Sequence, residues 1–322
     1  MALTASVVIP NWNGRNFLAP CLDALERQTR SDFEVIVVDN ASTDDSVELV
    51  ESRFPLVQVI RLPENRGFAA AMNEGIRRAP GPYVAFLNND TEPQPEWLAE
   101  LIACLERHPQ AAAATSKMLL ADDAGVIDDA GDLLTPTFLP YARGHGERDT
   151  GQYETEQQVF SASGGASLWR TEALREIGLF PEEFFAYYED VDLGFRARLA
   201  GYECWYAPRA VVKHKRGGSA EADSDFALRH HVRNRWLLLV RTVPGPLLLR
   251  RLPRILRGEG TWWARTVRAR RPASLLRAYA GVARSLPRAL AERREIQRRR
   301  AIDAGELERL LRAGAEPPPN NP

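Results

Sequence analysis

Two acidic segments, far apart in the chain, contain the side chains best suited to chemistry. The first is Leu87-Asn88-Asn89-Asp90-Thr91, and the second is Tyr188-Glu189-Asp190-Val191-Asp192-Leu193. A single histidine, His214, follows the second segment. If the fold brings these segments together, they supply a metal ligand and a carboxylate base at one site.

Asp90 is the candidate metal ligand. It follows the apolar run Tyr83-Val84-Ala85-Phe86-Leu87, which is typical of a buried parallel strand. Asp90 would then lie at the carboxyl end of that strand, where open α/β sheets bind their ligands. In an enzyme that cleaves a nucleotide diphosphate, a hard cation there would neutralise the charge that builds up on the leaving group. The alternative is that Asn89, Asp90 and Thr91 only cap a helix that begins near Pro95.

The elements around Asp90 form a repeating pattern of strands and helices. Apolar runs lie at 6–9, 35–38, 57–60 and 84–87, and helical stretches begin near Phe17, Ser46, Phe68 and Pro95. This alternation predicts a mostly parallel sheet with right-handed crossovers. Polar residues follow three of the strands, at 10–14, 39–44 and 88–90, so we expect the chemistry at one edge of the sheet.

The loops lack the glycine-rich signatures of two classes of nucleotide-binding protein. A dinucleotide-binding dehydrogenase needs Gly-x-Gly-x-x-Gly after its first strand, whereas this turn holds only Gly14. The sequence also contains no Gly-x-x-x-x-Gly-Lys-Ser/Thr motif, which argues against P-loop phosphoryl transfer. We therefore expect phosphate to be bound through a metal ion.

Five short motifs, taken in their order along the chain, resemble those of a known family. They are Val8-Ile9-Pro10-Asn11-Trp12-Asn13-Gly14, Val38-Asp39-Asn40-Ala41-Ser42-Thr43-Asp44, Asn65-Arg66-Gly67-Phe68-Ala69-Ala70-Ala71-Met72-Asn73, Leu87-Asn88-Asn89-Asp90-Thr91 and Glu189-Asp190-Val191-Asp192-Leu193. Over residues 5–240 the chain resembles the family-2 inverting glycosyltransferases of GT-A fold, most of all the bacterial rhamnosyltransferase branch. The resemblance implies a GT-A α/β fold with a mostly parallel central sheet and a nucleotide-sugar donor.

The resemblance also implies roles for individual residues. Asp39 would meet the nucleobase, and the donor site would further include Pro10, Asn13, Asn65, Gly67, Asn88 and Asn89. Asn88 stands where many relatives carry the first Asp of an Asp-x-Asp motif, so it can hydrogen-bond the ribose but adds no charge. Asp90 is then the acidic ligand. On spacing alone His214 is a bystander, but it fits the family's metal-binding histidine, and this ligand set suits Mn²⁺ or Mg²⁺.

Asp190 matches the family's general base. In an inverting transfer the acceptor hydroxyl attacks the anomeric carbon from the face opposite the leaving diphosphate, so a carboxylate must lie within reach of that hydroxyl. The segment 190–200 is helical in pattern, which places Asp190 near a helix N-terminus that favours a carboxylate. The alternative is that Glu189, Asp190 and Asp192 only complement the charge of that helix.

A run of small residues at 161–167 includes Gly164 and Gly165 and allows a backbone to approach a sugar closely. The family uses this segment beside the donor sugar and the acceptor, although a simple turn before a helix explains it equally well. Aromatic residues at 184–188 are suited to stacking on sugar rings or to forming core. From this region we choose Tyr188 and Glu189 as members of the substrate loop.

The composition favours a cytoplasmic protein. With 322 residues, 44% of them hydrophobic, the chain is able to bury one large core and an appendage. Cys21, Cys104 and Cys204 are widely spaced and odd in number, which argues against a disulfide framework or a zinc site. No apolar run approaches the roughly 18 residues of a membrane span. A strand follows the N-terminus directly, so we expect no signal peptide.

The net charge of -1 conceals an uneven distribution. Residues 241–301 contain 17 arginines and three glutamates, a local charge of +14. Because Pro244-Gly245-Pro246 marks a boundary, we expect a glycosyltransferase domain at 1–243, an Arg-rich helical region at 244–315 and a disordered tail at 316–322. Prolines are expected to break the helical region into short amphipathic helices.

Basic helices that carry Trp and Leu on the opposite face suit an anionic membrane surface. The protein would then be cytoplasmic, with a peripheral location on the inner face of the cell membrane. The alternatives are a solvated appendage or an oligomer contact. Nucleic-acid binding is not expected, because no fold for it is recognisable.

We expect an inverting glycosyltransferase that moves L-rhamnose from dTDP-rhamnose to a glycan or lipid-linked acceptor in cell-surface polysaccharide synthesis. One alternative is a UDP-sugar-dependent transferase for galactofuranose or glucose. Another is a non-catalytic sugar-nucleotide-binding assembly protein. The presence of Asp90, Asp190 and His214 together argues against the non-catalytic alternative.

Overall fold

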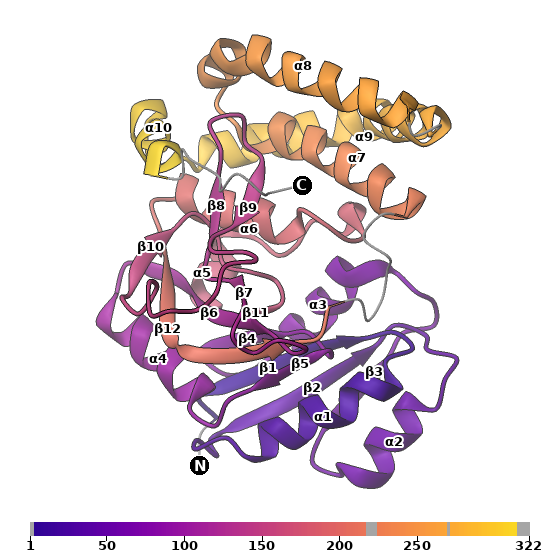
Figure 1. Cartoon of the computed structure of the whole chain (residues 1–322), viewed down its shortest axis with the longest axis vertical. Helices are drawn as coiled ribbons and strands as arrows, with labels where there is room; N and C mark the ends of the chain where they lie inside the picture. The colour runs from indigo at the N-terminus through magenta and orange to yellow at the C-terminus, as the bar shows by residue number, and fades with distance from the viewer. Residues whose placement is uncertain (1–2, 217–223, 269–270, 314–322) are drawn as a thin grey trace.

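A computed structural model describes residues 3–216, 224–268 and 271–313 (Figure 1). The first half of the chain alternates as the sequence predicts: β1 (Ala5–Asn11), α1 (Arg15–Glu26), β2 (Phe33–Asp39), α2 (Ser46–Arg53), β3 (Gln58–Arg61), α3 (Gly67–Arg78) and β4 (Tyr83–Leu87). These four strands are parallel, in the order β4-β1-β2-β3. Their carboxyl ends therefore meet at one edge of the sheet.

The second half of the chain widens this sheet. Its elements are β5 (Thr91–Pro93), α4 (Trp97–Arg107), β6 (Ala111–Leu120), β7 (Ile127–Asp129), β8 (Asp132–Leu134), β9 (Pro140–Ala142), β10 (Gln157–Val159), β11 (Ala166–Arg170), α5 (Thr171–Ile177), a 3₁₀ turn (Glu182–Phe184), α6 (Glu189–Leu199) and β12 (Glu203–His214). The full order is β10-β12-β6-β11-β4-β1-β2-β3, with β11 antiparallel to both of its neighbours. The fold is the mostly parallel, mixed α/β sheet that the sequence predicts.

Helices cover both faces of the sheet. Helices α1, α2 and α4 pack on one face, where Leu22, Val50 and Leu101 join one hydrophobic cluster with the strands. On the other face, α3, α5 and α6 contribute to a second cluster that includes Met72 and Leu193. With both faces buried, the strand ends at the edge are the exposed part of the sheet on which a site can be built.

The C-terminal region forms long helices: α7 (Asp225–Thr242), α8 (Gly245–Arg268), α9 (Pro272–Arg298) and α10 (Ala304–Ala313). The prediction of short helices broken by prolines is wrong, because Pro253 and Pro287 lie inside α8 and α9. An internal proline costs about 3 kcal/mol through one lost backbone hydrogen bond and a clash. Burial of apolar side chains, such as Ile255 and Ala289, offsets that cost.

These C-terminal helices stack on α6 at one end of the molecule (Figure 1). One hydrophobic cluster runs from Phe195 of α6 through Leu238 of α7 to Leu247, Ile255 and Leu307. The expected boundary at 243/244 falls in the turn between α7 and α8, and the core continues across it. The tail at 316–322 lies outside the described residues. Among the helices that the structure describes, none has the length and hydropathy to cross a membrane.

Candidate active site

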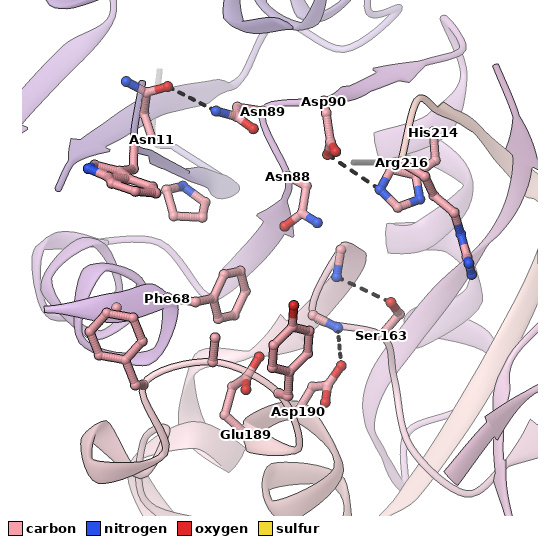
Figure 2. Close-up of a pocket in the computed structure, with 18 of the residues that line it drawn as sticks. Asn11, Phe68, Asn88, Asn89, Asp90, Ser163, Glu189, Asp190, His214 and Arg216 are labelled. Atoms are coloured by element: carbon pink, nitrogen blue, oxygen red, sulfur yellow. Dashed lines mark hydrogen bonds and ion pairs between the residues drawn. The ribbon is translucent and has the colours of Figure 1, made fainter. Parts of the chain in front are cut away.

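A cavity of about 870 Å³ opens beside the carboxyl ends of β1 and β4 (Figure 2). The predicted site residues that line it are Pro10, Asn65, Gly67, Asn88, Asn89, Asp90, Gly164, Gly165, Glu189, Asp190 and His214. The two acidic segments, separated in the sequence, thus face one cavity. Its size falls within the range of pockets that bind nucleotide-sized ligands.

Strand pairing brings Asp90 and His214 together. β5 pairs antiparallel with the end of β12, so that His214 lies opposite Thr91, and Lys215 donates its backbone N–H to the carbonyl of Asp90. As a result, His214 Nε2 lies 3.4 Å from Asp90 Oδ1. The capping alternative fails, because β5 separates Asp90 from α4, which begins at Trp97.

The second ring nitrogen of His214 is held by Asp128. His214 Nδ1 lies 2.6 Å from Asp128 Oδ2, on the far side of the ring from Asp90. Burial would lower the pKa of His214, but the hydrogen bonds to Asp128 and Asp90 outweigh it and raise the pKa to about 9. Asp128 also pairs with Arg216, whose Nε lies 2.5 Å from Oδ1. Sequence reasoning missed Asp128, because an isolated Asp-Asp pair on a short strand carries no recognisable signal.

Asp90 and His214 fit a divalent cation. A carboxylate oxygen and an imidazole nitrogen face each other, both at least four-fifths buried. The orientation of His214 by a carboxylate on its other nitrogen is the usual arrangement around metal-bound histidines. This donor set suits Mn²⁺ or Mg²⁺, with the remaining positions left for phosphate oxygens and water.

Asp190 lies in the first turn of α6, on the wall of the cavity below Asp90 and His214 in Figure 2. Its carboxylate accepts hydrogen bonds from the backbone N–H groups of Gly164, at 3.0 Å, and Val191, at 2.8 Å. Burial raises the pKa of Asp190, and these two bonds partly oppose the rise. The arrangement holds a desolvated carboxylate in a fixed position, as a general base requires. Gly164 thus positions the Asp190 carboxylate through its backbone N–H, a contact that the run of small residues at 161–167 does not predict.

The loop before Asp190 is held in an unusual backbone conformation. Phe185, Tyr187 and Tyr188 all have positive φ angles, between 65° and 71°. The buried side-chain amide of Asn234 donates to the carbonyls of Phe184, Ala186 and Tyr187 at 2.8 to 2.9 Å. Strained non-glycine residues persist only where the surroundings impose them. Asn234, another residue that sequence reasoning missed, is the anchor.

Further acidic residues line the cavity near Asp190. Burial and the charge of Asp190 raise the pKa of Glu189 well above its usual range, and its Oε2 atom has no partner among the described residues. Burial and the charge of Asp128 raise the pKa of Asp129 to about 7. Burial and the charge of Asp129 also raise the pKa of Asp132. Protonated carboxyl groups of this kind are able to donate hydrogen bonds to sugar hydroxyls.

Four residues of the sequence motifs do not line the cavity, and two of them, Asp39 and Asn13, lie at the end of β2 and just after β1. Asp39 does not line the cavity, and its buried carboxylate accepts from Asn11 Nδ2 and Ser42 N. Asn13 is also absent from the cavity, since its Oδ1 accepts from Thr43 N at 2.7 Å.

The other two lie on or beside α6. Tyr188 packs in the core that joins α6 to the C-terminal helices, whereas its neighbours Phe185 and Tyr187 line the cavity. The structure therefore does not place Tyr188 in the substrate loop's cavity wall, because its side chain is buried in that core. Asp192 is fully buried between Arg196 and Arg241, which outweigh burial and lower its pKa.

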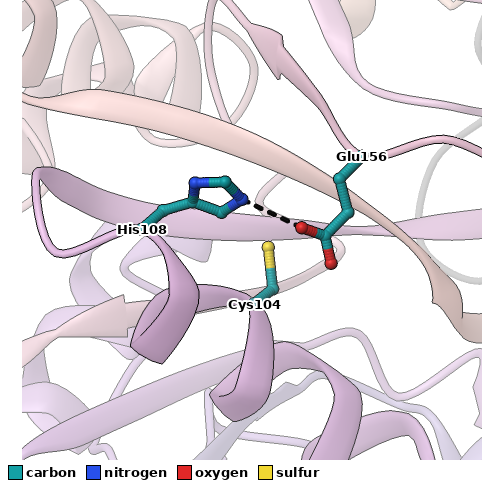
Figure 3. A group of neighbouring side chains, drawn as sticks. All are labelled: Cys104, His108 and Glu156. Carbon is teal, nitrogen blue, oxygen red and sulfur yellow. Dashed lines mark hydrogen bonds and ion pairs between the residues drawn. The ribbon is translucent and has the colours of Figure 1, made fainter.

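A separate group of potential ligands lies at the end of α4, where Cys104, His108 and Glu156 converge (Figure 3). No sequence motif predicts this group, because Glu156 is far from the helix in the chain. His108 Nε2 contacts Glu156 Oε2 at 2.9 Å, and Arg107 also pairs with that carboxylate. Burial, followed by the charge of Glu156, raises the pKa of Cys104 to about 12, so the thiol is protonated. These contacts tie the 150–157 loop to α4.

The chain belongs to glycosyl transferase family 2, whose family model matches residues 6–178. It is therefore a glycosyltransferase of GT-A fold, as the motifs predicted.

Known proteins resemble it over most of its length. It is 27% identical over 240 residues to the N-acetylglucosaminyl-diphospho-decaprenol L-rhamnosyltransferase of Mycobacterium tuberculosis, across 68% of this chain and 78% of that protein. The structure of Staphylococcus aureus TarS 1-349 aligns with a TM-score of 0.58 at 20% identity, over 97% of this chain and 91% of the other. The mannosyltransferase PcManGT from Pyrobaculum calidifontis, in complex with GDP-Man and Mn²⁺, aligns with a TM-score of 0.54 at 18% identity, over 98% and 80%.

Proposed function

We propose that this protein transfers L-rhamnose from dTDP-rhamnose to a glycan or lipid-linked acceptor, with inversion at the anomeric carbon. One observation carries the proposal: Asp190 and the Asp90–His214 pair line the same cavity. One site thus offers a place for a diphosphate and a base for the acceptor. The choice of rhamnose is supported by the mycobacterial relative, whose acceptor is a lipid-linked sugar diphosphate.

In the proposed reaction the Asp190 carboxylate accepts the proton of the acceptor hydroxyl as that oxygen attacks the anomeric carbon. The bond between the anomeric carbon and the donor phosphate breaks, and dTDP leaves with the bonding electron pair. Because the backbone N–H groups of Gly164 and Val191 hold Asp190, little reorganisation is needed when the proton moves.

Asp90 and His214 would hold Mn²⁺ or Mg²⁺, which supplies positive charge next to the diphosphate when bound. Asp128 keeps the His214 ring in the orientation that presents Nε2 to the cation. Solved proteins of this fold include one that holds Mn²⁺ with its nucleotide sugar. Asn65 and Asn88, on the cavity wall, are suited to hydrogen bonds with the nucleoside.

We also infer a peripheral membrane location on the inner face of the cell membrane. α8 exposes Leu249, Leu256 and Val267, which recur at intervals that place them on one side of a helix. Arg250, Arg254 and other basic side chains flank this stripe. An anionic bilayer matches both the apolar and the basic parts. A second copy of the chain is the alternative occupant.

A panel of nucleotide sugars tests the donor directly. In the presence of Mn²⁺ the true donor should raise the melting temperature most, because a ligand that binds only the folded state adds RT ln(1 + [L]/Kd) to stability. dTDP-rhamnose is the expected best ligand. A larger shift in melting temperature with UDP-galactofuranose or UDP-glucose would mean that this UDP-sugar, and not dTDP-rhamnose, is the donor. No shift with any donor would contradict sugar-nucleotide binding, and with it both the transferase and the non-catalytic alternative.

A further inference from the structure

A second hollow lies between α7 and α9, with a volume of about 430 Å³. We call it the basic groove, and define it by Arg229, His230, Arg233, Arg277, Arg284 and Ser285. Its other lining residues are alanine and glycine, so no carboxylate contributes to its wall.

The positive charge of the basic groove is not neutralised. Across the described ranges, none of its four arginines forms an ion pair, whereas Arg241 and Arg288 on the same two helices pair with Asp192 and Glu292. Burial, and then the charges of Arg233 and Arg229, lower the pKa of His230. A cluster of unpaired guanidinium groups in a hollow binds anions.

The centre of the basic groove is rigid. Arg233 Nη1 donates to the carbonyl of Glu183 at 2.7 Å, and Nη2 donates to Ser285 Oγ at 3.3 Å. Gly281 gives this side chain its room, since a Cβ at that position would lie 2.9 Å from Arg233 Cδ. A guanidinium that is fixed before a ligand arrives loses less entropy on binding it.

The basic groove adjoins the active-site cavity. Phe226 lines the cavity, and His230 lines the basic groove. Their ring centroids are 4.0 Å apart, and the two residues are one turn apart on α7, a rise of roughly 6 Å. The two hollows thus share a wall at Phe226 and His230, so one ligand is able to extend from the basic groove into the cavity.

We propose that the basic groove binds the diphosphate of a lipid-linked acceptor while the sugar attached to that diphosphate lies in the cavity beside Asp190. This inference rests on the proposed function and names its acceptor as a sugar diphosphate. In such an acceptor the diphosphate is bonded directly to the accepting sugar, which matches two hollows that adjoin at Phe226 and His230. Arginine forks suit phosphate oxygens in pairs.

The test compares the R277Q/R284Q double variant with R78Q/R294Q. All four arginines are exposed and form no ion pair within the described structure, and only the first two line the basic groove. Two acceptors are used: N-acetylglucosamine on a short-chain prenyl diphosphate, and a simple alkyl glycoside of the same sugar. We expect R277Q/R284Q to raise KM for the diphosphate acceptor about 10- to 100-fold and to leave KM for the glycoside unchanged. R78Q/R294Q should change neither.

Binding of inorganic pyrophosphate in metal-free buffer, followed by calorimetry, gives a readout that needs no donor sugar. It should weaken in R277Q/R284Q alone, even if the donor proves not to be dTDP-rhamnose. The proposal is overturned if both acceptors suffer equally, if both double variants behave alike, or if no change occurs. It is also overturned if R277Q/R284Q loses only its binding to phosphatidylglycerol vesicles, since the groove would then hold a membrane headgroup.

Discussion

His214 and Asp128 form a pair in which the carboxylate contacts one ring nitrogen at 2.6 Å while the other nitrogen faces Asp90. If this pair orients a metal ligand, D128N should weaken Mn²⁺-dependent binding of dTDP about 10- to 100-fold, as is usual for such supporting carboxylates. D90A should weaken it more, because it removes a ligand. Calorimetry with Mn²⁺ and with EDTA measures both effects. Equal affinities for all three proteins in Mn²⁺ would make Asp90, Asp128 and His214 purely structural.

The pH dependence of turnover reports on Asp190. A base must be ionised to accept a proton, so kcat falls as the pH drops through its pKa. Because burial raises that pKa, the acid limb should lie above the value of about 3.9 for an ordinary aspartate. The profile is measured with saturating Mn²⁺, donor and acceptor. An acid limb at or below the ordinary value would mean that the proton goes to another group.

The loop that precedes Asp190 packs closely against the backbone of Gly67, so that a side chain at position 67 would displace it. A Cβ at Gly67, whose φ is +83°, would lie 2.5 Å from the carbonyl oxygen of Phe185. G67A should therefore lower stability by about 1 to 3 kcal/mol and reduce kcat. G258A, on α8 with open space around it, is the control and should be neutral or slightly stabilising. Thermal melts and turnover of both variants measure these effects. A fully active and stable G67A would show that the close contact of Gly67 with Phe185 does not position the loop before Asp190.

The exposed stripe on α8 predicts binding to anionic vesicles. Deleting residues after 243 is not a clean test, because Leu247, Ile255 and Leu307 are part of a core shared with α6. L249Q/L256Q should keep the fold, because both side chains are exposed, and it removes the apolar face. The exposed Leu56 gives the control L56Q. Co-sedimentation should show loss of the salt-resistant part of binding in L249Q/L256Q alone. A wild-type protein that ignores anionic vesicles at low salt would leave the stripe as a contact between protein copies.

Much of the fold was predictable because it depends on local patterns. The apolar runs before Asn11, Asp39 and Asn88 fixed three strands, and parallel pairing places their ends at one edge. The position of Asp90 and His214 at one site followed from family motifs. Their contact itself depends on the pairing of β5 with β12, which no local pattern encodes.

Other parts of the site arise only from long-range packing. Asn234 anchors a loop that lies about fifty positions earlier in the chain, through three backbone carbonyls that leave no sequence signature. Asp128 and Asp129 reach the cavity from a three-residue strand. The aromatic run at 184–188 also gives no sign that Tyr188 packs against the C-terminal helices while Phe185 and Tyr187 line the cavity, since that choice depends on contacts with distant residues.

The central claim is that Asp190 is the base of an inverting transfer. The most direct measurement is transfer from dTDP-rhamnose to a lipid-linked N-acetylglucosamine acceptor by wild type and D190N, with the anomeric configuration of the product read by NMR. We predict a product of opposite configuration to the donor, and a loss of about 10²- to 10⁴-fold in kcat for D190N with donor affinity nearly unchanged. Near wild-type turnover by D190N, or a product that keeps the donor's configuration, would contradict the account.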